Sequence, residues 1–278
     1  MRRKWVHVST SFPVAGPAAA SGAPAPAPSA GLRHERKYLV SLGDAERIGD
    51  VLRRWMPPDT HAPQGAGTAY TVRSLYFDSA DLACYRAKVD GIARRHKVRL
   101  RAYGDRIGPR VRLEFKERHG ALYRKRRAWL TPGDLGLLRD REPLGGPLVD
   151  PGADPLHRLR YLMEHRGYAP SLLVAYEREA YTEGSGDDTV RVTLDRRVRA
   201  RAYPDIDDLY ADDGFAPVVD HAAILEVRFT DVVARALRAL AARFELQRRA
   251  CSKYAVSVAR VIGTGVRHEG GRDRVRGR

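Results

Sequence analysis

The chain has 278 residues, of which 43% are apolar, so it is long enough for one large domain or two small ones with a real hydrophobic core. A net charge of +16 favours polyanionic partners such as nucleic acid, phosphate chains, nucleotides or an anionic membrane, without choosing among them. No run of about 18 apolar residues argues for a transmembrane helix. Cys84 and Cys251 lack the spacing of a zinc site, which indicates reduced thiols in a cytoplasmic protein.

Both ends of the chain have compositions typical of unstructured segments. Residues 1–31 are rich in Ala, Pro, Ser and Gly, and prolines interrupt the apolar stretch that a signal peptide would need. Residues 263–278 are rich in Gly and Arg. We therefore expect a disordered leader over 1–31, one domain over 32–262 and a disordered basic tail over 263–278.

Apolar and polar residues alternate in eight segments and recur at helical spacing in others. In chain order, the predicted elements are a strand over 32–40, a helix over 44–55 capped by Ser41 or Asp44, strands over 70–78, 93–103, 110–117 and 123–130, a short helix opening at Thr131, a helix over 154–166, strands over 171–182, 189–200 and 223–229, a helix over 231–244 and a short helix or strand over 252–262. Consecutive antiparallel strands in this number form a sandwich, an open sheet or a barrel with a wide lumen. The alternation alone favours a sandwich or an open sheet.

Regularly spaced cations on the polar faces of these strands are the main functional signal. The sequence KVRLR at 97–101 puts three cations on one face, and RLEFK at 112–116 repeats the pattern around a carboxylate. Cations this close repel one another unless an anion lies between them, so the pattern predicts a site for a multiply charged anion. The candidates are Arg33, Glu35, Lys37, Lys97, Arg99, Arg101, Arg112, Glu114, Lys116, Tyr123, Lys125, Arg127, Tyr176, Arg178, Arg191, Thr193, Asp195, Glu226 and Arg228. A solvated outer face would explain any single strand, but not the same bias in six or seven.

The carboxylates of Glu114 and Glu226 lie among these cations and allow two interpretations. Each carboxylate forms an ion pair with a neighbour such as Lys116 or Arg228, or it binds Mg²⁺ or Mn²⁺, which prefer oxygen ligands and retain substrate phosphates. The sequence has no GxxxxGK[ST] loop and no GxGxxG motif after a strand. Bound phosphates would therefore have to be held by side-chain cations rather than by backbone amides.

Eight short motifs occur in an order that resembles the VTC domain, a polyphosphate polymerase domain of the triphosphate tunnel metalloenzyme superfamily. They are RHERKY at 33–38, SLYFD at 74–78, KVRLRAYG at 97–104, LEFK at 113–116, YEREAY at 176–181, VRVTLD at 190–195, LEVRF at 225–229 and SKY at 252–254. The resemblance covers residues 32–262. Each motif is weak alone, and their shared order makes the resemblance specific.

The resemblance implies an α+β fold, in which an eight-stranded antiparallel β-barrel forms a tunnel with flanking helices. It implies transfer of the terminal phosphoryl group of ATP to a growing polyphosphate chain, with Mn²⁺ or Mg²⁺ as cofactor. The implied catalytic residues are Lys37, Arg99, Arg101, Lys116, Arg178, Arg191 and Lys253. The implied substrate contacts are Lys125, Arg127, Tyr176, Ser252, Glu35 and Glu114, and the implied metal ligand is Glu226.

Three other functions fit the same residues. A tripolyphosphatase or nucleotide triphosphatase would use water in place of the chain end, and a non-catalytic module would bind polyphosphate without turnover. A nucleic-acid-binding protein is favoured only by the net charge and the Arg-rich tail. We expect ATP and polyphosphate as partners, no specific nucleic acid, and contact with a membrane only through another protein.

Overall fold

The computed structural model describes residues 34–59, 68–106, 108, 110–120, 122–140, 154–184, 189–229, 235–248 and 251–263. The leader expected over 1–31 lies outside these ranges, as does the expected basic tail apart from Gly263. Arg33, the side chain of Tyr123 and the first four residues of the helix expected over 231–244 also lie outside them.

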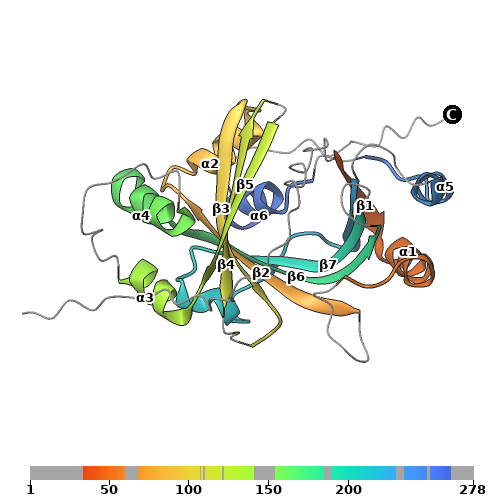
Figure 1. Cartoon of the computed structure of the whole chain (residues 1–278), viewed down its shortest axis with the longest axis horizontal. Coiled ribbons are helices and arrows are strands. Elements are labelled where there is room, and N and C mark those ends of the chain that lie inside the picture. The colour runs from red at the N-terminus through yellow and green to blue at the C-terminus, as the bar shows by residue number, and fades with distance from the viewer. Residues whose placement is uncertain are drawn as a thin grey trace, which may run out of the picture. The chain divides into compact units, whose positions relative to one another are not determined.

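The described residues form one antiparallel sheet with flanking helices (Figure 1). Its strands are β1 (His34–Ser41), β2 (Ala69–Asp78), β3 (Arg94–Tyr103), β4 (Val111–His119), β5 (Leu122–Leu130), β6 (Ala169–Glu183), β7 (Val190–Ala202), β8 (Ala216–Pro217) and β9 (Ala222–Phe229). The helices are α1 (Leu42–Trp55), α2 (Ala83–Val89), α3 (Pro132–Arg139), α4 (Pro155–Arg166), α5 (Arg235–Arg243) and α6 (Lys253–Val261), with a 3₁₀ turn at Asp207–Tyr210. The eight expected strands are confirmed as β1 to β7 and β9, and the segment over 252–262 is a helix.

The strand order is β1-β9-β7-β6-β2-β3-β4-β5, with β8 paired to β7. In Figure 1, β3, β4 and β5 rise steeply from β6 and β7, so the sheet curls around one of its faces. Among the described residues no backbone pairing joins β1 to β5, and the sheet is therefore not strictly closed. Side chains span this gap instead, because Lys116 Nζ on β4 lies 3.5 Å from Glu35 Oε2 on β1. The expected tunnel fold is confirmed, with an ion pair at the seam where β1 approaches the β4–β5 edge of the sheet.

The apolar faces of the strands point outward and are covered by helices. On β1, β7 and β9 they pack with Ile48 and Leu52 of α1, which are fully buried. On β4 and β5 they pack with α4, whose Leu159 is also fully buried. Burying the outer face in this way leaves the inner face to the charged residues, which reverses the usual arrangement of a small barrel.

Helix α6 lies on the inner face, on the opposite side of β3–β5 from α4 (Figure 1). The ring of Tyr254 lies 4.8 Å from the ring of Tyr76 on β2, and Lys253 Nζ lies 4.9 Å from the centroid of Tyr176 on β6. Tyr254 also belongs to the same buried cluster as Val174 and Val198. The C-terminal helix therefore fills one end of the inner face and brings its first residues to the charged part.

Two helix starts show how well local sequence predicts structure. Ser41 caps α1 as expected, because its hydroxyl accepts the backbone N–H of Asp44 at 3.0 Å. Helix α2 was not predicted, since its seven residues are too few for a periodic pattern. The buried carboxylate of Asp78, which ends β2, accepts the N–H groups of Cys84 at 2.8 Å and Tyr85 at 3.1 Å. A partner outside the helix thus stabilises its start.

None of the described helices has both the length and the apolar character needed to cross a membrane. Cys84 and Cys251 are both free thiols, as expected from the sequence. The cytoplasmic location stays a prediction.

Candidate active site

Strand register places the predicted cations on one face of the sheet. Directly opposed residues in neighbouring strands have side chains on the same face. The opposed pairs on this face are Arg99–Glu114, Arg101–Arg112, Lys116–Lys125, Glu114–Arg127, Arg178–Asp195, Arg191–Arg228, Glu226–Thr193, Lys37–Glu226 and Glu35–Arg228. Because the sheet curls toward this face, residues from strands far apart in the sheet order can meet across it.

Glu114 on β4 lies at the centre of the first cluster, with only 2% of its side chain exposed. Its Oε2 accepts from Arg99 Nε at 2.8 Å and Nη2 at 2.6 Å, and Lys125 Nζ lies 3.1 Å from Oε1. Arg112, Arg101 and Arg127 approach the same carboxylate at 3.7, 3.9 and 3.9 Å. We call these six residues the Glu114 cluster.

Burial alone would raise the pKa of Glu114, but Arg99 and Arg101 hold it well below its usual range. Burial lowers the pKa of Lys125 to about 7, and the neighbouring cations Arg99 and Arg127 add to this effect. Even where Lys125 is neutral, a single carboxylate cannot balance the four arginines around it. The cluster therefore carries an excess of positive charge in a partly desolvated place, which favours binding of a multiply charged anion.

The second cluster lies on β1 and β9 and holds two carboxylates. Lys37 Nζ lies 2.8 Å from Glu35 Oε1 and 3.3 Å from Glu226 Oε2. Arg228 contacts Glu226 and lies 3.5 Å from Glu35. Burial opposes ionisation of Glu226, yet Lys37 and Arg228 hold the pKa of its carboxyl well below the usual range. We call these four residues the Glu226 cluster; both of its carboxylates are oxygen donors.

Beside this cluster, Arg178 on β6 binds Asp195 on β7. Arg178 Nε and Nη2 donate to the two carboxylate oxygens of Asp195 at 2.6 and 2.8 Å, and both side chains are almost completely buried. Lys253, the first residue of α6, binds the same carboxylate. Tyr176 lies over Arg178 and its hydroxyl accepts from Arg101 Nη2 at 3.3 Å. Tyr176 and Arg101 thereby connect this group to the Glu114 cluster.

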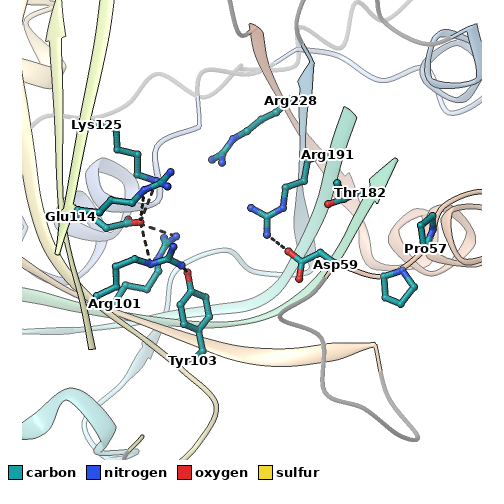
Figure 2. Close-up of a pocket in the computed structure, with 12 residues that line it drawn as sticks. Pro57, Asp59, Arg101, Tyr103, Glu114, Lys125, Thr182, Arg191 and Arg228 are labelled. Carbon is teal, nitrogen blue, oxygen red and sulfur yellow. Dashed lines mark hydrogen bonds and ion pairs between the residues drawn. The ribbon is translucent and has the colours of Figure 1, made fainter. Parts of the chain in front are cut away.

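A cavity of about 500 Å³ opens between strands β3–β5 on one side and strands β7 and β9 on the other. Figure 2 shows Glu114 and Lys125 on one wall and Arg191 and Arg228 on the other, with the Arg228 guanidinium directed across the space. Asp59, which follows α1, binds Arg191 at the edge of the cavity. The cavity is large enough for a chain of phosphates, and six of its twelve lining residues are Arg or Lys, against two carboxylates.

The residues expected to bind phosphate all lie on this inner face or at the start of α6. Lys97 Nζ donates to Ser252 Oγ at 2.8 Å, so Ser252 lies at the same surface. One predicted pairing is wrong: Glu114 binds Arg99 and Lys125, whereas Lys116 reaches Glu35 on β1. Lys116 is opposite Lys125 in the sheet, and its ammonium group reaches across to the Glu35 carboxylate, which also binds Lys37 and Arg228. The predicted pairing of Glu226 with Arg228 is confirmed.

The inner face offers a divalent metal ion two carboxylates, Glu35 and Glu226, rather than a complete set of protein ligands. The described residues contain no group of three or more His, Cys, Asp or Glu side chains placed to hold a metal ion. Glu35 and Glu226 nonetheless share Lys37. The hydroxyl of Thr193, the residue opposite Glu226, is buried without a hydrogen-bond partner in the part of the chain that the structure describes. Mg²⁺ and Mn²⁺ are often held by one or two carboxylates plus substrate phosphates, so these residues fit such an ion.

Two residues near the site escaped the sequence analysis. Asp59 follows Pro57 and Pro58 outside any periodic element, so no pattern indicates that it binds Arg191. Asp78 lies inside a recognised motif, but its contact with the Tyr254 hydroxyl joins residues 176 positions apart. Only the folded chain brings such partners together.

Comparison with known proteins shows which family the chain belongs to and which solved structure it resembles. A solved structure described as a putative adenylate cyclase from Bacillus halodurans aligns with 80% of this chain and 95% of its own length, with 12% sequence identity and a TM-score of 0.43. No curated protein matches the chain. The family model of the VTC domain matches residues 32–262, and the chain therefore belongs to the VTC domain family.

Proposed function

We propose that this chain is a metal-dependent polyphosphate polymerase, which transfers the terminal phosphoryl group of ATP to a growing polyphosphate chain inside its tunnel. One observation carries the proposal: cations from seven strands and from α6 converge on the inner face, in excess of the carboxylates among them. Membership of the VTC domain family supports it. We also propose ATP and polyphosphate as ligands, with contact to a membrane only through another protein.

The arrangement suits phosphoryl transfer, which needs donor and acceptor in line and charge stabilisation on the transferred group. Arg99, Arg101 and Lys125 would hold phosphate oxygens on the β3–β5 side of the inner face, and Arg178 and Lys253 would hold them on the side formed by β6 and α6. Fixed cations align the reactants and stabilise developing negative charge without reorganising during the reaction. The terminal phosphate of the growing chain acts as nucleophile, so no side chain has to form a covalent intermediate.

Glu35 and Glu226 would hold the Mn²⁺ or Mg²⁺ ion, with the hydroxyl of Thr193 beside them. The ion would supply charge neutralisation on the phosphate oxygens. Lys37 now binds both carboxylates and would turn toward the phosphates once the ion balances Glu35 and Glu226. The chain would thus provide two ligands and leave the remaining positions to water and substrate.

The decisive experiment incubates purified protein with ATP and Mn²⁺ and separates the products on a polyacrylamide gel. A ladder of polyphosphate together with ADP is the expected result, and omission of the metal should abolish it. Release of inorganic phosphate without a ladder would show a hydrolase in the same tunnel. Tight binding of polyphosphate without consumption of ATP would show a non-catalytic module.

A further inference from the structure

A row of aromatic rings and one guanidinium crosses β3, β4 and β5 at the edge of the cavity. Arg112 Cζ on β4 lies 5.1 Å from the ring centroid of Tyr103 on β3 and 5.1 Å from that of Trp129 on β5. Arg112 also donates to the Tyr103 hydroxyl. The guanidinium is therefore held between two rings, which is a favourable cation–π geometry.

Trp129 is the outermost member of this row and is unusually exposed. The residue is 52% exposed, whereas the Arg112 side chain is only 14% exposed. Large aromatic side chains normally bury most of their surface, so an exposed indole next to a charged cavity suggests a ligand with a flat face. Arg112 and Arg127, which flank Trp129 in the sheet, both line the cavity.

We propose that the exposed indole of Trp129 stacks against the nucleobase of the donor nucleotide, while its triphosphate runs past Arg112 into the Glu114 cluster. The inference rests on the proposed function and deepens it, because it assigns the cavity edge to the nucleoside and the interior to phosphates. In a nucleotide, one ribose separates the base from the first phosphate. In the protein, the Arg112 guanidinium lies between Trp129 and Glu114, so a base stacked on Trp129 would have its phosphates beside the Glu114 cluster. A polyphosphate chain has no base and does not use this surface.

Stacking on an aromatic side chain tolerates every base, since each base has a π-face. The site thus favours a nucleoside triphosphate over bare tripolyphosphate without selecting strongly among bases. Trp129 is a binding residue in this assignment, and the phosphate contacts remain those of the inner face.

The test measures binding by calorimetry in metal-free buffer, where neither ligand is turned over. The ligands are the β,γ-imido analogue of ATP and inorganic tripolyphosphate, and the proteins are wild type, Trp129→Ala and Trp129→Phe. For Trp129→Ala we expect the ATP analogue to bind about 5- to 100-fold more weakly, with tripolyphosphate affinity unchanged. Trp129→Phe, which retains a ring, should lose less. Unchanged tripolyphosphate binding also shows that the variant is folded.

Two results would overturn the inference. If Trp129→Ala weakens both ligands equally, Trp129 serves only to hold Arg112 in place. If it weakens neither, the indole contacts no ligand. Failure of the ATP analogue to bind the wild-type protein even after Mn²⁺ is added would reject the proposed function together with the stacking site.

Tryptophan fluorescence gives an independent readout, because the chain has only three tryptophans: Trp5, Trp55 and Trp129. Trp55 at the end of α1 is similarly exposed, at 49%, and serves as the matched control. The ATP analogue should quench the fluorescence of Trp55→Phe as it does that of wild type. Quenching that persists in Trp129→Phe would contradict the proposal.

Discussion

The Glu114 cluster and the Glu226 cluster are built from the same residue types in different proportions. Among the described residues, four arginines and Lys125 surround the single carboxylate of Glu114. In the Glu226 cluster, the two cations Lys37 and Arg228 face two carboxylates, Glu35 and Glu226. The first cluster has a large excess of positive charge, and the second is balanced.

This difference separates two tasks that phosphoryl transfer requires. Excess positive charge in a desolvated place holds phosphate oxygens directly. A balanced set that contains two carboxylates has oxygen ligands to offer a divalent ion. Substitutions in the two clusters should therefore fail in different ways, and the predictions below begin with the largest expected effect.

Replacing Arg99 with Ala should remove the cation that binds Glu114 most closely and that we propose as a phosphate ligand. We expect turnover with ATP and Mn²⁺ to fall by about 10²- to 10³-fold or more, because a fixed donor to the reacting phosphate is lost. The other four cations remain around Glu114, so the fold should survive, as far-UV circular dichroism can show.

The matched control is Arg47→Ala, since Arg47 is an exposed arginine on α1 whose ion pair with Asp44 lies outside the tunnel. Its turnover should equal that of wild type, because pairs at the surface contribute little. Retention of polymer synthesis by Arg99→Ala would show that the Glu114 cluster is not where phosphate is transferred.

The clusters should also differ in their response to metal. Glu226→Gln should shift the Mn²⁺ dependence of activity to at least about tenfold higher concentrations, because it removes a proposed ligand. Glu114→Gln should lower activity at every Mn²⁺ concentration and leave the midpoint of the titration in place. The same midpoint in wild type and Glu226→Gln would reject Glu226 as a metal ligand.

Much of this site could be predicted from the sequence, and for a specific reason. Alternation along a strand decides which side chains share a face, so KVRLR at 97–101 already placed Arg99 beside Arg101. Alternation does not reveal which face is enclosed, and by itself it favoured a sandwich or open sheet. Only the resemblance to the VTC domain implied a tunnel.

Contacts that cross the tunnel lay beyond local patterns. The pairing of Lys116 with Glu35 depends on how far the sheet curls, and a one-strand view instead suggests Glu114 as the partner. The ion pair of Arg191 with Asp59 depends on the path of the chain after α1. Such partners are fixed by tertiary structure, because no periodic pattern relates residues so distant in the sequence.

Tyr254→Phe should have a moderate effect, because Tyr254 positions α6 rather than touching phosphate. Its hydroxyl contacts the buried carboxylate of Asp78, which also accepts backbone N–H groups of α2. Losing this donor should cost about 1–3 kcal/mol in the free energy of unfolding, measured with urea. Turnover should fall severalfold, since α6 carries Ser252 and Lys253 to the tunnel.

Tyr203→Phe is the control for this substitution, because Tyr203 is 65% exposed. Neither its stability nor its turnover should change. If Tyr254→Phe is destabilised but turns over normally, the contact with Asp78 supports the fold alone.

The smallest effect we expect is a pH dependence of anion binding that comes from two buried lysines. Burial lowers the pKa of Lys97 to about 7, with further contributions from Lys37 and Lys116, and burial lowers the pKa of Lys125 to about 7 as well. Both values lie well below the ordinary lysine pKa of 10.5. At pH 8 these side chains are therefore mainly neutral in the free protein, and a bound anion should protonate them.

Two consequences follow from the sign of this shift. Between about pH 7 and 10.5 the unfolded chain binds protons that the folded chain lacks, so both lysines should make the free energy of unfolding rise with pH in that window. Tripolyphosphate should bind more tightly as pH falls from 9 to about 7, because protonated lysines attract it.

Calorimetry at pH 8 in buffers with different ionisation enthalpies measures the protons taken up on binding tripolyphosphate. The ligand's own titration is common to every variant, so the difference between wild type and Lys97→Met reports Lys97 alone. We expect that difference to be close to one proton, since a lysine with a pKa of about 7 is mainly neutral at pH 8 and becomes charged beside phosphate. Equal uptake by the two proteins would mean that Lys97 does not meet the bound anion, and would place the phosphates on the Lys125 side of the inner face.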